Sequence, residues 1–225
     1  MKRGKFAVVA AAGLGTRMGI TTSKVLSELG NTSCIQKLLT DLNDCADHIF
    51  LVLGYEKEKI QFVCKPLLYK TTIVINDQYL TNSTLDSFKL GIGALQSKFA
   101  NVKSDSIITF ITGDLVINPQ DLNGFIRDLS GDVFCGLSPL LTKDGHKALY
   151  DDHFVYDLNP NLKSELEWAN IANISIDQVM LSDNKYLREV VKDMSPVKYK
   201  KVTAIDIDNQ QDLEKARLIH KSKSI

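Results

Sequence analysis

A glycine-rich segment near the N-terminus, Ala10–Gly19 with the sequence AAAGLGTRMG, is the strongest candidate for a ligand-binding loop. It directly follows an apolar run that is typical of a strand. Glycines let the backbone turn tightly and approach a ligand closely, so that amide N–H groups can bind phosphate oxygens. Arg17 lies inside the segment, and its guanidinium suits paired hydrogen bonds to a phosphate. Lys24 adds a second cation nearby, unless it is a solvated surface lysine.

The spacing of these glycines differs from two other nucleotide-binding patterns. The segment reads G-x-G-x-x-x-G, whereas dinucleotide-binding folds carry G-x-G-x-x-G and P-loop proteins carry G-x-x-x-x-G-K-[ST]. The second apolar run, His48–Leu53, also does not end in an acid that could bind a ribose. A dinucleotide-dependent oxidoreductase is therefore the weakest hypothesis. A tight turn that binds no ligand is the alternative to a phosphate site.

Two acidic clusters could hold the metal ion that phosphoryl transfer from a nucleoside triphosphate needs. Gly113-Asp114 closes the apolar run Ile107–Thr112, and ligands of open α/β sheets gather at the carboxyl ends of strands. Asp206 and Asp208 share one face of a strand, because side chains alternate along a strand with period two. Mg²⁺ is bound by one or two such carboxylates together with substrate phosphates. The alternatives are a solvated acidic edge strand and, for Asp208, a helix N-cap.

The only tryptophan of the chain, Trp168, lies beside Glu165, Glu167 and Asn170. A tryptophan face among carboxylates suits a small cationic group such as choline or ethanolamine. Tyr150 could complete an aromatic cage, or could pack within its own segment. Core packing of Trp168 stays open as the alternative. The four histidines show no metal-ligand spacing, so a zinc site is not expected.

Short apolar runs that alternate with longer segments of helical period must position these residues. Strands are expected at Phe6–Ala11, His48–Leu53, Thr71–Ile75, Ser106–Thr112 and Asp132–Leu137. Helices are expected between them at Ser33–Ala46, Glu56–Lys65, Ser83–Lys98 and Pro119–Leu129. The continuous apolar runs indicate strands that are buried on both faces. The rhythm predicts a doubly wound α/β fold, with a mostly parallel Rossmann-like sheet and helices on both faces.

The pattern changes after Ser138. His146–Asp157 and Glu165–Met180 are polar, aromatic and turn-rich, which indicates a β-rich excursion over one edge of the sheet. The remaining elements are expected at Asp183–Lys192 (helix), Val197–Asp206 (strand) and Gln210–Lys221 (helix). We therefore expect a single domain, 1–225, with a small β-rich lid insertion at about 140–181.

Composition narrows the class of protein. The 225 residues are 44% hydrophobic and 24% charged, and Lys plus Arg equals Asp plus Glu at 27 each. The resulting zero net charge argues against a broad basic face for nucleic acid. No apolar run reaches the roughly 20 residues of a membrane helix, and the N-terminus does not read as a signal peptide. Four scattered cysteines without a C-x-x-C pair then predict free thiols in a reducing cytoplasm.

The glycine segment resembles the signature of the nucleotidyltransferase superfamily, roughly A-G-x-G-T-R-M-x and then a lysine, which here is Ala12–Gly19 and Lys24. Val25 stands where that signature usually has proline. The closest similarity is to small members of the phosphocholine cytidylyltransferase-like and MobA-like kinds. Tyr79–Ser87 is similar to a stretch of the former that contributes to the nucleobase and substrate pocket.

The acidic clusters resemble the superfamily too. Gly113-Asp114 matches the G-D that follows a central strand, and the segment from Ala204 to Ala216 is similar to E-I-D-x-x-x-D-L-x-x-A. Asp206 stands in for the glutamate of that pattern, and Asp208 matches its first aspartate. The resemblance implies a Mg²⁺ site at Asp114, Asp206 and Asp208. It also implies catalytic roles for Arg17, Lys24 and Asp114.

The resemblance further implies where the substrates bind. The expected nucleotide-binding residues are Ala11, Ala12, Gly13, Leu14, Gly15, Thr16, Arg17, Lys24, Asn82 and Ser83. The expected acceptor-binding residues are Glu167, Trp168 and Tyr150. For Asn82 and Ser83, which open a predicted helix, N-capping is the alternative.

The implied reaction moves a nucleoside monophosphate onto a small phosphorylated or phosphonate acceptor, with release of pyrophosphate. CMP from CTP and a phospho-amine acceptor are favoured. A sugar-1-phosphate nucleotidyltransferase is the first alternative, and a non-catalytic nucleotide-binding domain of the same fold is the second. Neither nucleic acid nor a membrane is an expected partner, and a homodimer is an assembly that the sequence leaves open.

Overall fold

A nine-stranded sheet forms the centre of the computed structural model, which describes residues 4–15, 23–128 and 131–221. The strand order is β3-β2-β1-β4-β9-β6-β10-β8-β7. The strands are β1 Phe6–Ala11, β2 His48–Leu53, β3 Thr71–Ile75, β4 Ile107–Thr112, β6 Phe134–Ser138, β7 Lys147–Tyr150, β8 Phe154–Asn159, β9 Glu167–Ser175 and β10 Val197–Lys201. β3, β2, β1 and β4 are parallel, and β6 is parallel to β10, whereas β9 is antiparallel to both of its neighbours.

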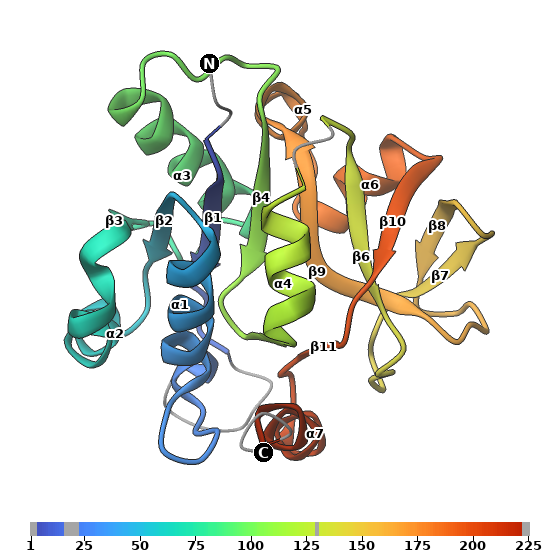
Figure 1. Cartoon of the computed structure of the whole chain (residues 1–225), viewed down its shortest axis with the longest axis horizontal. Coiled ribbons are helices and arrows are strands. Elements are labelled where there is room, and N and C mark those ends of the chain that lie inside the picture. The colour runs from blue at the N-terminus through green and yellow to red at the C-terminus, as the bar shows by residue number, and fades with distance from the viewer. Residues whose placement is uncertain (1–3, 16–22, 129–130, 222–225) are drawn as a thin grey trace.

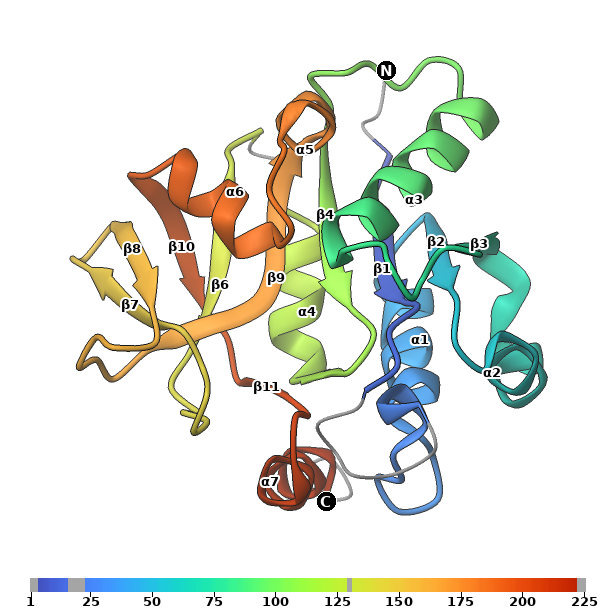
Figure 2. The same ribbon diagram turned by 180° about the vertical axis from the view of Figure 1, so that it is seen from behind.

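Helices cover both faces of this sheet, as Figure 1 and Figure 2 show from opposite sides. The helices are α1 Cys34–Cys45, α2 Lys57–Cys64, α3 Thr84–Lys98, α4 Pro119–Ile126, α5 Ile176–Leu181, α6 Leu187–Asp193 and α7 Gln210–Lys221, with short 3₁₀ turns at Lys24–Leu26 and Lys65–Lys70. α1 and α4 lie on one face, and α3, α5 and α6 lie on the other. The predicted α/β fold is therefore confirmed.

The alternation of side chains along β1 shows why both faces need cover. Ala7 and Val9 point into the apolar cluster beneath α1, and Val8 points into the cluster beneath α3. All three are fully buried, which is the burial expected of a parallel strand between two helical layers. On α3, Gly91 lies so close to Val8 that an added Cβ would be 2.3 Å from a Val8 methyl carbon.

Side-chain caps fix where the helices next to β1 begin. The Ser33 side chain accepts a hydrogen bond from the backbone of Gln36, and the Gln36 side chain accepts one from the Ser33 backbone. Ser83 and Asp86 form the same reciprocal pair at the start of α3. Each capping box satisfies two amide groups that a helix leaves unpaired at its first turn.

The structure differs from the sequence expectation at the predicted β-rich excursion. Only β7 and β8 lie at the edge of the sheet, whereas β9 runs through its middle, between β4 and β6. The expected lid at about 140–181 therefore contains one of the strands around which the sheet is built. The expected strand Val197–Asp206 is also divided, into β10 and a separate β11, Ala204–Asp206.

This division of the chain after β10 brings the two acidic clusters together. β11 leaves the main sheet and pairs antiparallel with β5, Leu115–Ile117, so that Asp206 lies opposite Leu115. The amide of Ile207 donates a hydrogen bond to the carbonyl of Asp114 at 3.3 Å. Residues that are about 90 positions apart in the sequence thus meet at the carboxyl end of β4.

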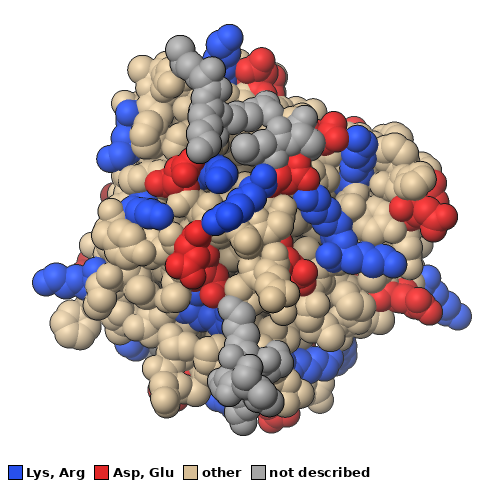
Figure 3. All heavy atoms as spheres, in the orientation of Figure 1, with Lys and Arg blue, Asp and Glu red and all other residues tan. Residues whose placement is uncertain are grey.

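Other sequence expectations concern the surface and the cysteines. On the face drawn in Figure 3, basic and acidic side chains are interspersed, as the balanced composition predicts. Within the described residues, no helix is long and apolar enough to cross a membrane. The four cysteines are free thiols, and all of them are buried.

Candidate active site

Lys24 and the two acidic clusters form one polar centre at the carboxyl edge of the sheet. The Lys24 ammonium contacts Asp114 Oδ2 and lies 2.7 Å from Asp208 Oδ1. Asp114 is only 6% exposed, so this ion pair is largely shielded from solvent. The structure thus brings together three of the residues that the sequence assigned to the metal and the triphosphate.

Burial and neighbouring charges shift the pKa values of these groups in different directions. Burial alone would lower the pKa of Lys24, but the charges of Asp114, Asp206 and Asp208 outweigh it and hold that pKa above its usual value. Burial would raise the pKa of Asp114, yet Lys24 and a hydrogen bond from Asp206 hold it below its usual value. Burial and the neighbouring Asp114 raise the pKa of Asp206 well above its usual range. Within this pair, Asp114 therefore loses its proton more readily than Asp206.

The described part of the glycine loop packs directly against Lys24. Gly15 has a φ of +67°, a conformation that side-chain-bearing residues rarely adopt. A Cβ at Gly15 would be 2.9 Å from Lys24 Cγ and 3.0 Å from its backbone nitrogen. By contrast, a Cβ at Gly13 would meet no atom of the described residues within 4 Å. Thr16 and Arg17 lie outside the described residues.

The polar centre forms one wall of a cavity of about 370 Å³. The predicted nucleotide and metal residues that line it are Ala11, Gly13, Leu14, Gly15, Lys24, Asp114, Asp206 and Asp208. A smaller neighbouring cavity of about 70 Å³ is lined by Ala12, Asn82 and Ser83, among others. The side chains of Asn82 and Ser83 are already engaged, since Asn82 donates to Asn76 Oδ1 at 3.1 Å and Ser83 caps α3.

The far side of the large cavity is built from different elements. Trp168 and Asn170 of β9, His146, and Tyr186 with Arg188 at the start of α6 line it. Trp168 is 6% exposed and also belongs to the apolar cluster beneath α6, so it both packs in the core and forms cavity wall. The Arg188 guanidinium lies 4.0 Å from the centre of the Tyr186 ring. A cation and two aromatic rings therefore line the same cavity as the carboxylates.

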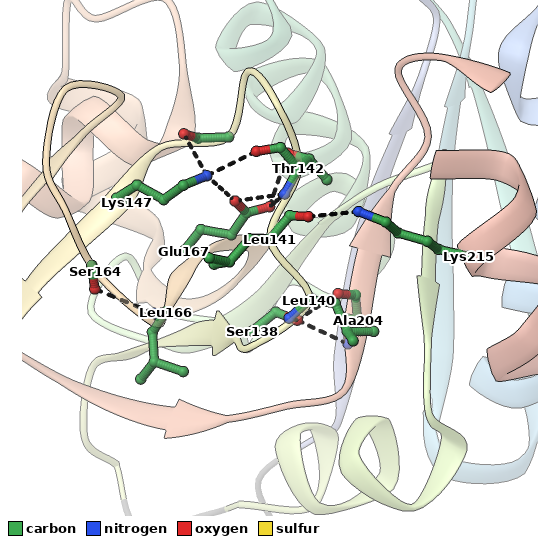
Figure 4. A network of polar contacts seen from close by, with 11 residues as sticks. Ser138, Leu140, Leu141, Thr142, Lys147, Ser164, Leu166, Glu167, Ala204 and Lys215 are labelled. Atoms are coloured by element: carbon green, nitrogen blue, oxygen red, sulfur yellow. Dashed lines mark hydrogen bonds and ion pairs between the residues drawn. The ribbon is translucent and has the colours of Figure 1, made fainter. Parts of the chain in front are cut away.

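Glu167, a predicted acceptor-binding residue, is engaged in a loop network that Figure 4 shows. It accepts hydrogen bonds from the Thr142 amide at 3.0 Å and from the Thr142 hydroxyl at 2.9 Å, and it forms an ion pair with Lys147 at 2.5 Å. A Cβ at Gly145 would be 2.2 Å from Glu167 Oε2, so the loop closes tightly around the carboxylate. Glu167 therefore holds the loop that walls the cavity.

Tyr150, the third predicted acceptor residue, does not line the cavity in the described structure. Its ring packs against the Tyr199 ring, and the two ring centroids are 5.7 Å apart. This contact lies at the edge of the sheet that β7, β8 and β10 form. Tyr150 is therefore a packing residue in this structure, which is the alternative to an aromatic cage that the sequence left open.

The comparisons with known proteins identify the family. Residues 7–158 match the model of the MobA-like NTP transferase domain. The chain belongs to that family. The inositol-1-phosphate CTP transferase of T. maritima is similar over 99% of this chain and 98% of its own, with a TM-score of 0.75 and 16% identity. A CTP:phosphocholine cytidylyltransferase from Streptococcus pneumoniae is similar over 97% and 100%, with a TM-score of 0.72 and 22% identity.

A third solved structure widens the range of similar proteins. It is a putative glucose-1-phosphate thymidylyltransferase from Bacillus anthracis, which is similar over 97% of this chain and 96% of its own. The TM-score is 0.78 and the identity is 12%. At such identities the likeness shows a shared fold, and the matched family model shows that the chain is a nucleotidyltransferase-family protein.

The polar centre of this NTP transferase domain fits a divalent cation. The described residues hold no three His, Cys, Asp or Glu side chains arranged to bind a metal on their own. However, a cationic group, the Lys24 ammonium, already lies between Asp114 and Asp208. Asp206 Oδ1 is buried and has no hydrogen-bond partner within the part of the chain that the structure describes. Because Mg²⁺ typically takes one or two protein carboxylates and completes its shell with water and phosphate oxygens, this set of carboxylates suits it.

Sequence reasoning missed Arg188, Tyr186 and His146. Arg188 and Tyr186 lie at the start of α6, where no motif marks them, and only the packing of α6 beside β9 brings them to the cavity. Burial, followed by the nearby charge of Arg188, lowers the pKa of His146 to about 4, so the imidazole is neutral near pH 7. A histidine immediately before a β-strand carried no signal that could have found this site.

Proposed function

We propose that the chain is a Mg²⁺-dependent nucleotidyltransferase that moves a nucleoside monophosphate, CMP from CTP in the favoured case, onto a small phosphorylated acceptor. An oxygen of the acceptor phosphate forms a bond to the α-phosphorus, the bond from that phosphorus to the bridging oxygen breaks, and pyrophosphate leaves. One observation carries this proposal. The loop at Gly13–Gly15, Lys24, the carboxylates Asp114 and Asp208, and Arg188 all line a single cavity.

The residues at the carboxylate wall would receive the triphosphate. Backbone amides of Gly13–Gly15 can donate to phosphate oxygens, since Gly13 leaves open space where a side chain would stand. The Lys24 ammonium offers positive charge beside the same loop, and we expect Arg17 to add a second cation. Asp114 and Asp208 would hold the Mg²⁺, with Asp206 as a further ligand or as the holder of a bound water. Bound there, the ion would neutralise phosphate charge and polarise the α-phosphate.

The part of the cavity lining that includes Arg188 suits the acceptor. The Arg188 guanidinium presents a planar set of donors that matches a phosphate group. A phosphate oxygen is already ionised near pH 7, so the reaction requires no protein base. Catalysis then consists of holding two anions in line and offsetting their charge, which is the main contribution that proteins make to phosphoryl transfer.

The preference for CTP rests on the similarity of this chain to solved structures of CTP-using enzymes. Two of the similar structures are described as a CTP transferase and a CTP:phosphocholine cytidylyltransferase. The small cavity beside Gly13 is lined by Asn82 and Asn76, which would exchange their mutual hydrogen bond for contacts to the polar edge of a base. A cytosine, with one exocyclic amine and one carbonyl, is a suitable size for such a site.

A sugar or polyol phosphate is the second candidate acceptor, and the position of Glu167 favours it. The carboxylate that was expected to face a cationic amine is instead bound by Lys147 and Thr142. Glu167 lines the cavity together with Asp144 and Asn170. This polar surface suits hydroxyl groups, whereas Trp168 with Tyr186 still suits an amine.

A substrate matrix tests the proposal. Pyrophosphate release is measured with each of four nucleoside triphosphates against phosphocholine, phosphoethanolamine, inositol-1-phosphate and glucose-1-phosphate, with Mg²⁺ and with EDTA. We expect turnover with CTP and one acceptor class, and none in EDTA. The matched variants are Asp208→Asn and Asp132→Asn, since Asp132 is an exposed acid that precedes β6 at the opposite edge of the sheet. Asp208→Asn should abolish turnover and Asp132→Asn should not. Pyrophosphate release that survives EDTA would remove the metal from the proposal.

A further inference from the structure

The single tryptophan of the chain is tied to a residue two positions along the same strand. Trp168 Nε1 donates a hydrogen bond of 2.7 Å to Asn170 Oδ1. Both residues line the large cavity on its acceptor side. Trp168 has two side-chain torsions about which its indole can turn, so a hydrogen bond at its polar edge fixes which surface it presents to the cavity.

Asn170 also has an unusual backbone conformation. Its φ is +53°, in the left-handed region that glycine occupies most readily and that asparagine tolerates best among the other residues. The pairing of β9 with β6 is irregular at this point, because Cys135 pairs with Ala172 whereas Leu137 pairs with Trp168. Figure 1 and Figure 2 show β9 curving strongly along its length. The left-handed residue thus lies where β9 carries extra residues relative to β6.

Asn170 therefore does two separable things. It allows the strand to bend, which a glycine would do with less strain. It also supplies the oxygen that holds the indole N–H, which a glycine could not do. A purely structural role would make glycine at least as good as asparagine at this position.

We propose that Asn170 is a positioning residue for the acceptor, acting by fixing the indole of Trp168 against the cavity. That the ligand at this wall is the acceptor rests on the proposed function, whereas the effect of Asn170 on the indole does not. Without Asn170 Oδ1, a largely buried N–H donor lacks a partner, which is unfavourable. Turning the indole to find another partner changes the shape of the cavity wall between Trp168 and Arg188.

The first test uses the fluorescence of the sole tryptophan in the resting protein. Asn170→Gly keeps the bend and removes the hydrogen bond, so we expect only a small net change in the melting temperature, because the relief of backbone strain offsets the cost of the unpaired indole N–H. We also expect the emission to shift and acrylamide to quench Trp168 more strongly than in the wild type. Asn161→Gly, at an exposed position in the turn between β8 and β9, is the matched control and should leave the spectrum unchanged. Wild-type quenching and emission in Asn170→Gly would overturn the proposal.

The second test measures kinetics with whichever acceptor of the substrate matrix supports turnover. Asn170→Gly should raise the acceptor KM about 5- to 30-fold, as loss of one such contact implies, with little change in the KM for the nucleotide. Trp168→Phe removes the donor, so Asn170→Gly should have little further effect in that background. An unchanged acceptor KM, or equal effects in both backgrounds, would contradict the positioning role. If no acceptor is turned over, the proposed function fails while the fluorescence test still decides on Asn170.

Discussion

The ion pair between Glu167 and Lys147 offers a sharp test of how the acceptor loop is held. The two side chains are 6% and 13% exposed, and Lys147 also donates to the carbonyls of Thr142 at 2.9 Å and Gly145 at 3.3 Å. Removing one partner of a buried pair leaves the other charge without compensation and typically destabilises a protein by about 3 kcal/mol or more. At about 2–4 °C per kcal/mol for a chain of this size, either Glu167→Gln or Lys147→Met should lower the melting temperature by roughly 6–12 °C.

The double variant shows whether the two side chains act together. In Glu167→Gln with Lys147→Met neither charge is left alone, so the loss should be smaller than the sum of the single losses by about 1–3 kcal/mol. The exposed pair Lys198–Asp132, with side chains 52% and 48% exposed, serves as the control. Its variants should each change stability by less than about 1 kcal/mol. The assay is thermal and denaturant unfolding of all variants without substrate.

The competing interpretation, in which Glu167 binds the acceptor directly, makes the opposite forecast. It expects Glu167→Gln to raise the acceptor KM while the melting temperature stays at the wild-type value. Additive single losses, or losses no larger than those of the exposed control pair, would show that the network around Thr142 does not hold the loop as we describe.

Three further predictions concern the site. Asp114→Asn should lower turnover about 100-fold or more, because a buried electrostatic contact to the reacting groups is lost, with folding retained by circular dichroism. Gly15→Ala should weaken nucleotide binding in a titration, because its Cβ would meet Lys24, whereas Gly30→Ala shares a positive φ of +94° but meets no atom within 4 Å and should bind normally. The pKa of His146 is lowered to about 4 from the usual 6.5, so the unfolded chain binds this proton first as the pH falls. Stability that is fully present above pH 6.5 should therefore decline toward pH 4, and His146→Gln should show a shallower decline in melting temperature.

Much of the sheet could be predicted from the sequence because its strands are continuous apolar runs bounded by polar turns. β1, β2 and β3 have the expected bounds, and α7 begins and ends as expected. These elements are set by local pattern, since β1 and β2 are buried on both faces, β3 is a short β-branched run at the sheet edge, and α7 has one apolar side. The loop at Gly13–Gly15 and Asp114 could be placed for the same reason, because both directly follow such strands.

The rest depends on contacts between distant parts of the chain. The place of β9 in the middle of the sheet follows from its pairing with β4 and β6, for which its own polar sequence gives no signal. Nothing in the sequence shows that Lys147, 20 residues earlier, reaches the carboxylate of Glu167. Arg188 was missed because a single arginine at the start of a short helix belongs to no sequence pattern. Its place in the cavity lining follows only from the packing of α6 beside the cavity.

The central claim, that this domain transfers a nucleoside monophosphate, is tested most directly by following the phosphorus atoms. CTP labelled at the α-phosphate and CTP labelled at the γ-phosphate are incubated separately with Mg²⁺ and the acceptor that releases pyrophosphate in the substrate matrix. The account predicts that the α-label appears in the acceptor product and the γ-label in pyrophosphate. An α-label that ends in free CMP, or a γ-label that moves to the acceptor, would contradict it, because the first is hydrolysis and the second is a kinase reaction.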